Sequence, residues 1–290
     1  MVLITILAPA KINLSLDVTG RLENGYHTLE MIMQTISLYD EVLLHKAGDG
    51  IEIKCDNPLV PVDENNICHR AAKIFFDKTS ISGGVIIELK KRIPQGAGLA
   101  GGSADAAAVL KGLNIMYSAG FSTNELLELG LECGADVPFC IAGGTCFAGG
   151  IGEKLTKLPS FAGFYVIVIV PEFAVSTAWV YRNFRMDACI KRPDNKMLAE
   201  AIKKRDLRSL AQGMVNVLES VTVAKYPEIE GIKKDIKRNG ALGSLMSGSG
   251  PSVFGLFESE SSALKAFSVL KNRYRYIYMV STVDGGRVYG

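Results

Sequence analysis

Alternating hydrophobic and polar residues predict β-strands in the first third of the chain. Between Lys11 and Val18, hydrophobic side chains occupy every second position, so that one face of a strand is apolar and the other polar. Residues 2–20 are therefore predicted to form a pair of strands. The same alternation predicts strands at Thr35–His45, Ile51–Cys55 and Val85–Ile93.

Helical spacing of hydrophobic residues predicts helices between and after these strands. One helix covers Asn66–Thr79, and a second covers Ser103–Ser118, where an alanine-rich run follows a serine in the N-cap position. Ser122 and Glu125 have the spacing of a capping box, which opens a third helix that ends near Gly134.

The second half of the chain is predicted to form a separate α+β layer. A boundary near Leu158–Ser160 divides the chain into domains of residues 1–158 and 159–290. The predicted elements beyond it are, in order, a strand at Phe164–Val170, helices at Lys196–Arg205, Asp206–Val221 and Pro227–Asn239, strands at Leu242–Met246 and Val253–Phe257, a helix at Ser261–Arg273 and a strand at Tyr276–Val283. This order is ferredoxin-like.

Composition and charge exclude several classes of protein. Lysine and arginine number 32 against 30 aspartates and glutamates, and this balance provides no general attraction to nucleic acid or membranes. The 6 cysteines include no C-x-x-C pair and the chain has only 3 histidines, which indicates free thiols rather than a zinc site. The apolar start has no basic n-region, and Phe161–Val170 is too short to span a membrane. We therefore expect a cytoplasmic protein.

The strongest chemical signal is a glycine-rich loop between a predicted strand and a predicted helix. Its sequence is Pro94-Gln95-Gly96-Ala97-Gly98-Leu99-Ala100-Gly101-Gly102-Ser103-Ala104. Glycines allow positive φ and a close approach of the backbone to a ligand. A helix that begins at the end of such a loop directs unpaired N–H groups at one point, which favours phosphate binding over a merely flexible turn.

Two common phosphate-binding patterns fit this loop incompletely. Gly96-x-Gly98-x-x-Gly101 matches the dinucleotide fingerprint, but the preceding strand alternates in polarity and a helix stands where a second strand is required. The spacing also approaches that of a Walker A motif, with Gly102 in the position of the lysine. The positive charge for a polyphosphate must therefore come from elsewhere in the chain.

The loop resembles the P-x-G-x-G-L-[GA] loop of the GHMP kinases, a family that includes galactokinase, homoserine kinase and mevalonate kinase. Three further segments, Pro9–Leu14, Asn24–Leu29 and Gly134–Phe139, resemble the family members of the non-mevalonate route to isoprenoid precursors. The resemblance implies a two-domain α+β GHMP kinase fold, with a ribosomal S5 domain 2-like N-terminal domain and a ferredoxin-like C-terminal domain. It also implies transfer of phosphate from ATP, with Mg²⁺, to the 2-hydroxyl of a cytidine-diphosphate-linked methylerythritol.

The same resemblance assigns catalytic and nucleotide-binding roles. Lys11 matches the catalytic lysine and Asp136 the general base, while the loop of residues 94–104 matches the ATP-binding loop. Asn66 matches an adenine-contacting asparagine, although its position also suits a helix N-cap. Ser103 could contact the Mg²⁺, and because no acidic residue stands out as a metal ligand, none is assigned. By periodicity alone, Lys11 would be a solvated strand residue and Asp136 a helix cap.

Five residues are implied to bind the small-molecule substrate. They are Asn13, Tyr26, His27, Thr177 and Tyr181, with the two tyrosines expected on either side of the cytosine ring. The alternative for Tyr181 is packing in the core of the second domain.

Two other functions remain open at the level of sequence. One is a GHMP kinase with a different alcohol, of the homoserine or mevalonate type, and Asn24–His27 is the segment that separates it from the first interpretation. The other is a non-catalytic nucleotide-binding module. In each case the partner is a small molecule rather than a nucleic acid or a membrane, and the chain is expected to be a monomer or a weak homodimer.

Overall fold

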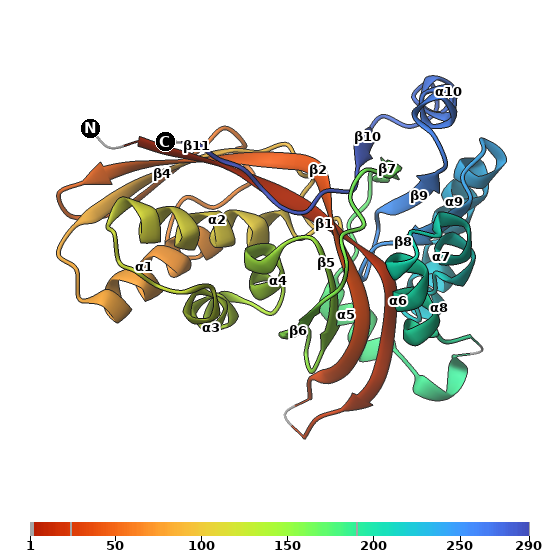
Figure 1. Ribbon diagram of the computed structural model, residues 1–290, viewed down its shortest axis with the longest axis horizontal. Coiled ribbons are helices and arrows are strands. Elements are labelled where there is room, and N and C mark those ends of the chain that lie inside the picture. The colour runs from red at the N-terminus through yellow and green to blue at the C-terminus, as the bar shows by residue number, and fades with distance from the viewer. Residues whose placement is uncertain (1–2, 24, 190, 290) are drawn as a thin grey trace.

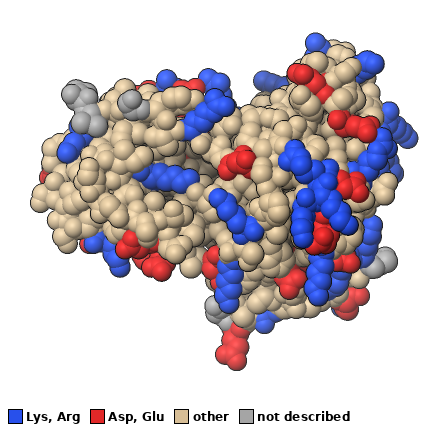
Figure 2. All heavy atoms as spheres, viewed as in Figure 1, with Lys and Arg blue, Asp and Glu red and all other residues tan. Residues whose placement is uncertain are grey.

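The computed structural model describes residues 3–23, 25–189 and 191–289 (Figure 1), so Asn24, the first residue of the segment Asn24–Leu29, lies outside the described residues. Figure 1 shows two halves, each a β-sheet with helices packed on it, and the two ends of the chain close together on the first half. Basic and acidic side chains are interspersed over the visible face and are densest on the second half (Figure 2), in keeping with a net charge of +2.

A seven-stranded sheet forms the first half, in the order β11-β1-β2-β4-β3, with β5 and β6 continuing from β2. Its strands are β1 (Leu3–Arg21), β2 (His27–Ala47), β3 (Gly50–Cys55), β4 (Gly84–Lys90), β5 (Thr145–Gly149), β6 (Lys154–Lys157) and β11 (Val288–Tyr289). Val85, Ile87 and Leu89 of β4 are buried, which confirms the predicted apolar face of this strand. Because β11 pairs with β1, Val288 and Tyr289 lie in the first sheet, although the predicted second domain extends to residue 290.

The predicted strand pair at residues 2–20 is wrong, because β1 is one continuous strand. Its partner along the whole length is β2, and the pairing register shifts between Pro9 and Lys11 and again between Asn13 and Ser15. Such irregularities bend a strand and re-aim its side chains without ending it. Ala10, Ile12 and Leu14 are all fully buried, and the polar residues between them are buried as well, because both faces of this stretch are covered.

Four helices cover one face of the first sheet (Figure 1). They are α1 (Ile67–Thr79), α2 (Gly101–Met116), α3 (Thr123–Cys133) and α4 (Val137–Ala142). The capping box of Ser122 and Glu125 is present with both of its hydrogen bonds, so that prediction is confirmed. The predicted N-cap at Ser103 is wrong: the N-cap lies three residues earlier, at Ala100, whose left-handed conformation (φ 58°) turns the chain into a helix that begins at Gly101.

The second half has the ferredoxin-like architecture expected from the order of its elements. Its four antiparallel strands lie in the order β10-β7-β9-β8, so that β10, the last of them in the sequence, pairs with β7, the first. They are β7 (Tyr165–Ile169), β8 (Gly243–Met246), β9 (Val253–Phe257) and β10 (Ile277–Ser281). The helices are α5 (Thr177–Asn183), α6 (Asn195–Lys203), α7 (Leu207–Gly213), α8 (Glu219–Lys225), α9 (Glu228–Arg238) and α10 (Glu260–Leu270), with a 3₁₀ turn at Met186–Ala188.

The single helix predicted over Asp206–Val221 is wrong, because it is divided into α7 and α8. The chain leaves the helix after Gly213 and runs extended beside β1, where Leu16 N donates to Val215 O at 2.9 Å and Val217 N donates to Leu16 O at 3.0 Å. Glycine is a weak helix former, and these long-range hydrogen bonds replace the helical ones. The break connects the second half of the molecule to the strand that carries Lys11.

The six cysteines are free thiols in the structure. In the described part of the chain, no helix combines the length and the apolar character that a membrane span requires.

Candidate active site

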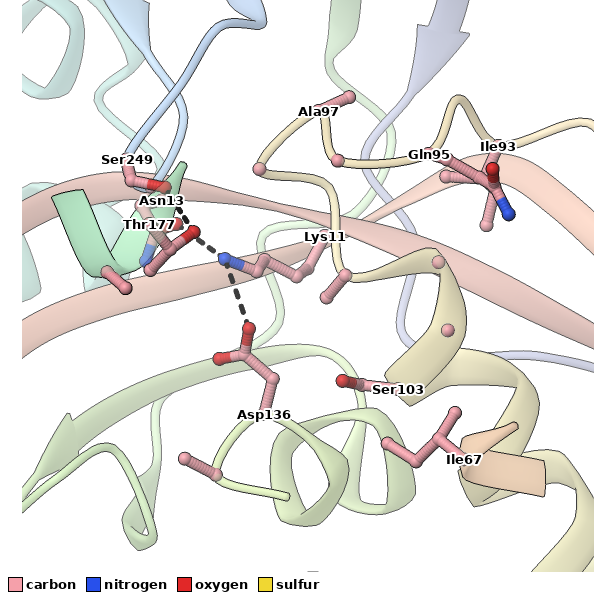
Figure 3. Close-up of a pocket in the computed structure, with 18 of the residues that line it drawn as sticks. Lys11, Asn13, Ile67, Ile93, Gln95, Ala97, Ser103, Asp136, Thr177 and Ser249 are labelled. Atoms are coloured by element: carbon pink, nitrogen blue, oxygen red, sulfur yellow. Dashed lines mark hydrogen bonds and ion pairs between the residues drawn. The ribbon is translucent and has the colours of Figure 1, made fainter. Parts of the chain in front are cut away.

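A cavity of about 1040 Å³ lies where the two halves meet, and most of the predicted site residues line it (Figure 3). From the glycine-rich loop these are Pro94, Gln95, Gly96, Ala97, Gly98, Ala100, Gly101, Gly102 and Ser103. From other elements they are Lys11, Asn13, Tyr26, His27, Asn66, Asp136, Thr177 and Tyr181. The side chains of Leu99 and Ala104 are buried in the core behind the loop, and a contact of ATP with the backbone of these two residues remains a prediction.

Lys11 and Asp136 point toward each other across this cavity (Figure 3). Lys11 Nζ lies 3.8 Å from Asp136 Oδ2 and donates a hydrogen bond to Asn13 Oδ1 at 2.8 Å. The lysine side chain is 6% exposed and that of the aspartate 38%, so the ammonium is held inside the wall while the carboxylate remains open to the cavity. Asp136 occupies the N-cap position of α4 but makes no side-chain capping bond, which leaves its carboxylate available to a ligand.

The backbone places Lys11 directly beside the glycine-rich loop. Lys11 N donates to Leu99 O at 3.0 Å, and this bond falls where the register of β1 against β2 shifts. The strand irregularity therefore lets β1 bond to the loop as well as to its neighbour in the sheet. The loop has no lysine of its own at the Gly102 position, and the ammonium beside it comes from a strand some 90 positions earlier in the chain.

The loop leaves the first turn of α2 open. Gly96 and Gly98 adopt positive φ (61° and 76°), and Ala100 provides no side-chain cap for the helix. The N–H groups of the first turn therefore have no capping side chain, and the positive end of the helix dipole lies beside the cavity. A polyphosphate fits this arrangement, because it brings the acceptors that these donors need.

A second glycine-containing turn, Ser247–Ser252, packs against this loop. Ser247 Oγ donates to Gly98 O at 3.0 Å, Ser252 N donates to Ala97 O at 3.2 Å, and the Ser252 hydroxyl donates to the same carbonyl. Asn216 holds the turn in place, since its side-chain amide donates to Met246 O at 2.9 Å and to Gly248 O at 2.7 Å. The sequence offered no signal for Asn216, which lay inside a predicted helix.

Gly98→Ala is expected to weaken ATP binding about tenfold or more. A Cβ at Gly98 would lie 2.3 Å from Ser247 O, so either the glycine-rich loop or the turn must move, and backbone displacements of this kind cost about 1–3 kcal/mol. Gly96→Ala is the matched control, because φ is also positive there (61°) but no atom lies within 4 Å of the added Cβ. Equal ATP affinities of the two variants, measured by titration calorimetry, would contradict the close contact as the cause.

Aromatic side chains gather at the other end of the cavity. The ring of His27, at the start of β2, stacks on Tyr181 of α5 with centroids 5.4 Å apart and an interplanar angle of 30°. Tyr26 also lines the cavity and is 60% exposed. Burial, and after it the charge of Arg21, lowers the pKa of His27, so the imidazole is neutral at pH 7 and can both donate and accept a hydrogen bond.

Asn66 and Thr177 make side-chain hydrogen bonds to other parts of the chain. Asn66 is the N-cap of α1, where Oδ1 accepts from Cys68 N at 2.8 Å and Nδ2 donates to Pro61 O at 2.6 Å. Its capping role is confirmed, and adenine contact remains a prediction. The Thr177 hydroxyl lies 2.8 Å from Ser249 Oγ, so it joins α5 to the turn at Ser247–Ser252 (Figure 3).

A buried charged cluster supports the loop from behind, and no sequence pattern had indicated it. Lys91 Nζ donates to Asp40 Oδ2 and to Asp105 Oδ2, and all three side chains are at most 5% exposed. Asp40 also accepts from Ile93 N at 2.8 Å, just before the loop begins. Burial alone would lower the pKa of Lys91, but the two carboxylates outweigh it and raise that pKa, so the ammonium is retained. Lys91 and Asp105 line the cavity, and Asp105 Oδ1 is buried with no hydrogen-bond partner among the described residues.

No group of three or more histidine, cysteine, aspartate or glutamate side chains in the described ranges is arranged to hold a metal ion. The hydroxyl of Ser103 faces the cavity from the first turn of α2 (Figure 3). A hydroxyl beside bound phosphates suits Mg²⁺, which keeps several waters and phosphate oxygens among its ligands.

Open backbone amides on one wall and an ammonium–carboxylate pair opposite them are what phosphoryl transfer to an alcohol requires. Together with the two-domain α+β fold, this cavity defines a small-molecule kinase. The family models agree: residues 66–144 match the GHMP kinases N terminal domain and residues 198–275 match the GHMP kinases C terminal domain.

Relatives narrow the class further. A 4-diphosphocytidyl-2-C-methyl-D-erythritol kinase of Acetivibrio thermocellus is 50% identical over 97% of this chain and 99% of its own length. A kinase of the same name from Clostridium acetobutylicum is 45% identical over 95% of this chain and 99% of its own length. A crystal structure of a 4-(cytidine 5'-diphospho)-2C-methyl-D-erythritol kinase superimposes with a TM-score of 0.83 at 34% identity, over 97% of this chain and all of that one. A homoserine kinase from Cytophaga hutchinsonii shares the fold, with a TM-score of 0.82 at 24% identity over 99% and 97% of the two chains. The chain belongs to the GHMP kinase family and, within it, to the 4-diphosphocytidyl-2-C-methyl-D-erythritol kinases.

Proposed function

We propose that this protein transfers the γ-phosphoryl group of ATP to the 2-hydroxyl of 4-diphosphocytidyl-2-C-methyl-D-erythritol. The observation that carries the proposal is the position of the Lys11–Asp136 pair, between the open N-terminus of α2 and the aromatic end of one cavity. A substrate with a nucleobase at one end and an alcohol at the other matches these two groups of lining residues. The proposed location is the cytoplasm, and the proposed state is a monomer or a weak homodimer.

The residues at the acceptor end suit a cytidine diphosphate. Tyr26 and Tyr181 offer flat apolar faces to the base, and the neutral His27 offers both a donor and an acceptor to its edge. Arg21 and Arg182 also line the cavity and would provide charges for the diphosphate. Asn13, which accepts a hydrogen bond from Lys11, and Thr177 line it as well and would contact the methylerythritol.

The catalytic step requires alignment and charge compensation rather than a covalent intermediate. The amides of Gly96–Ser103 would bind the triphosphate, and Mg²⁺, held by its oxygens and the Ser103 hydroxyl, would neutralise part of its charge. Asp136 would accept the proton of the substrate's 2-hydroxyl. The hydroxyl oxygen would form the new bond to the γ-phosphorus as the bond to ADP breaks and ADP leaves. Lys11 would stabilise the negative charge that develops on that oxygen.

A panel of alcohols tests the substrate assignment. Coupled ADP release is measured with 4-diphosphocytidyl-2-C-methyl-D-erythritol, L-homoserine and R-mevalonate at equal concentrations. We expect kcat/KM at least 100-fold higher for the cytidyl substrate, because the other two alcohols leave the aromatic end of the cavity unfilled. Comparable rates with all three would remove the cytidyl assignment while leaving a kinase.

Tyr26→Ala is expected to weaken the cytidyl substrate about 5- to 100-fold with little effect on ATP. The range lies within the effect of a base–aromatic stacking contribution of about 1–3 kcal/mol. The Kd of the substrate is measured by calorimetry in the absence of ATP, and Tyr276→Ala, which removes an exposed tyrosine from the second half of the molecule, serves as control. An unchanged Kd in Tyr26→Ala would contradict the stacking role.

A further inference from the structure

A second cavity, of about 700 Å³, lies in the ferredoxin-like half and takes no part in the proposed reaction. It is bounded by the end of α7, the segment that follows it, α8, α9 and the edge strand β8. Ser244 of β8 lines it, and the Ser244 hydroxyl oxygen is buried without a hydrogen-bond partner among the described residues. A buried hydroxyl without a partner is costly, so this site has a polar group available to a ligand.

The charges around this cavity are predominantly positive. Four lysines line it, namely Lys191, Lys233, Lys234 and Lys237, against two carboxylates, Glu219 and Glu230. Lys233 is bound to both carboxylates, with distances of 2.6 Å to Glu219 and 3.2 Å to Glu230, and Lys234 lies 4.0 Å from Glu230. Lys191 and Lys237 have no carboxylate partner within the described ranges. Figure 2 shows basic side chains gathered, with a few acidic ones among them, over this half of the molecule.

We propose that this cavity binds a small molecule that carries a phosphate or diphosphate group. The two lysines without carboxylate partners and the unpartnered hydroxyl provide the charge and the hydrogen bond that such an anion needs. The wall also contains Met214, Val217, Leu242 and Leu245, which would contact an organic part of the ligand. The volume is within the range of pockets that hold metabolites and is larger than a single phosphate requires.

The position of the cavity connects it to the active site. Glu219 Oε2 accepts from Lys233 Nζ at 2.6 Å, while Glu219 Oε1 accepts from Met246 N at 2.8 Å. Met246 directly precedes the turn Ser247–Ser252, which packs on Gly98 of the nucleotide loop. An anion that draws Lys233 away from Glu219 would therefore alter the hydrogen bond between Glu219 and Met246, which holds that turn. Binding in the second cavity would in this way affect the ATP-binding loop.

Inorganic diphosphate is the probe for this site. It is titrated calorimetrically into the protein with ADP kept at saturation, so that the nucleotide loop is occupied. We expect Lys191→Gln/Lys237→Gln to lower the affinity at least tenfold. The matched control, Lys265→Gln/Lys271→Gln, removes the same charge from exposed positions of the same half and is expected to change the affinity for diphosphate less than twofold. Ser244→Ala, which leaves the net charge unchanged, is expected to lower the affinity for diphosphate at least threefold.

Three results would overturn the proposal: no binding of diphosphate to the ADP-saturated wild type, an equal loss of affinity in the two double variants, or an unchanged affinity in both Ser244→Ala and Lys191→Gln/Lys237→Gln. Amide hydrogen exchange at Met246 checks the link to the active site. We expect its rate to change at least twofold on addition of diphosphate to the wild type and not in Lys191→Gln/Lys237→Gln. Binding without that change would refute the link.

Discussion

Asp136→Asn and Lys11→Ala are each expected to lower turnover at least ~100-fold while ATP affinity changes little. General-base catalysis contributes a factor of about 10²–10⁴, and the amide has no basic oxygen to accept the alcohol proton. Loss of the ammonium removes the charge that stabilises the developing alkoxide. ATP affinity is retained because the backbone amides of the loop, not these side chains, bind most of the triphosphate.

Single-turnover rapid quench measures this effect free of product release. The controls are Asp77→Asn and Lys73→Ala, two exposed residues of α1 that remove the same kinds of charge outside the cavity, and both should retain the wild-type rate. Lys11→Arg is informative as well, because a bulkier cation in a side-chain site that is 6% exposed cannot keep the same position. Normal single-turnover rates in Asp136→Asn would refute its role as the base.

The second large effect is on stability: Lys91→Met is expected to lower the free energy of unfolding by about 3–5 kcal/mol. That is the usual cost of removing one partner of a buried ion pair, because the remaining charge is left uncompensated. Here two carboxylates, Asp40 and Asp105, would face each other without the ammonium, and their side chains are 0% and 3% exposed. Because Asp40 also binds the backbone at Ile93, the start of the nucleotide loop should loosen together with the cluster.

Urea unfolding measures the change, with Lys90→Met as the matched control. Lys90 is the neighbouring residue, its side chain is 44% exposed and its ion pair with Glu41 is at 3.7 Å, so its loss should cost less than about 1 kcal/mol. Adding Asp105→Asn to Lys91→Met removes one of the two acidic groups, whose pKa is already raised by burial, and should recover part of the stability. Equal losses in Lys90→Met and Lys91→Met would show that the cluster contributes no more than a surface pair.

Local patterns predicted most of the elements, because each of those signals acts over a few residues. The alternation at Val85–Leu89 identified a strand buried on one face, and the pair Ser122 and Glu125 identified a helix start with both of its capping bonds. The order of elements after Leu158 was sufficient for the ferredoxin-like arrangement. The errors arose where distant contacts override local preference: β1 continues through Pro9, and the helix begun at Leu207 stops at Gly213 so that the next residues can pair with β1.

By itself, the sequence determined the class of fold, the glycine-rich loop and, through a family resemblance, the residues now found around one cavity. The tertiary structure decided which groups meet there: the Lys11–Asp136 distance, the charged cluster behind the loop, and the bonds by which Asn216 and Glu219 hold the turn above it. The physical reason is that hydrogen-bond and turn preferences are encoded within a few residues. Charge pairing between residues as far apart as Lys11 and Asp136 leaves no periodic trace in the sequence, because it depends on how distant elements pack against one another.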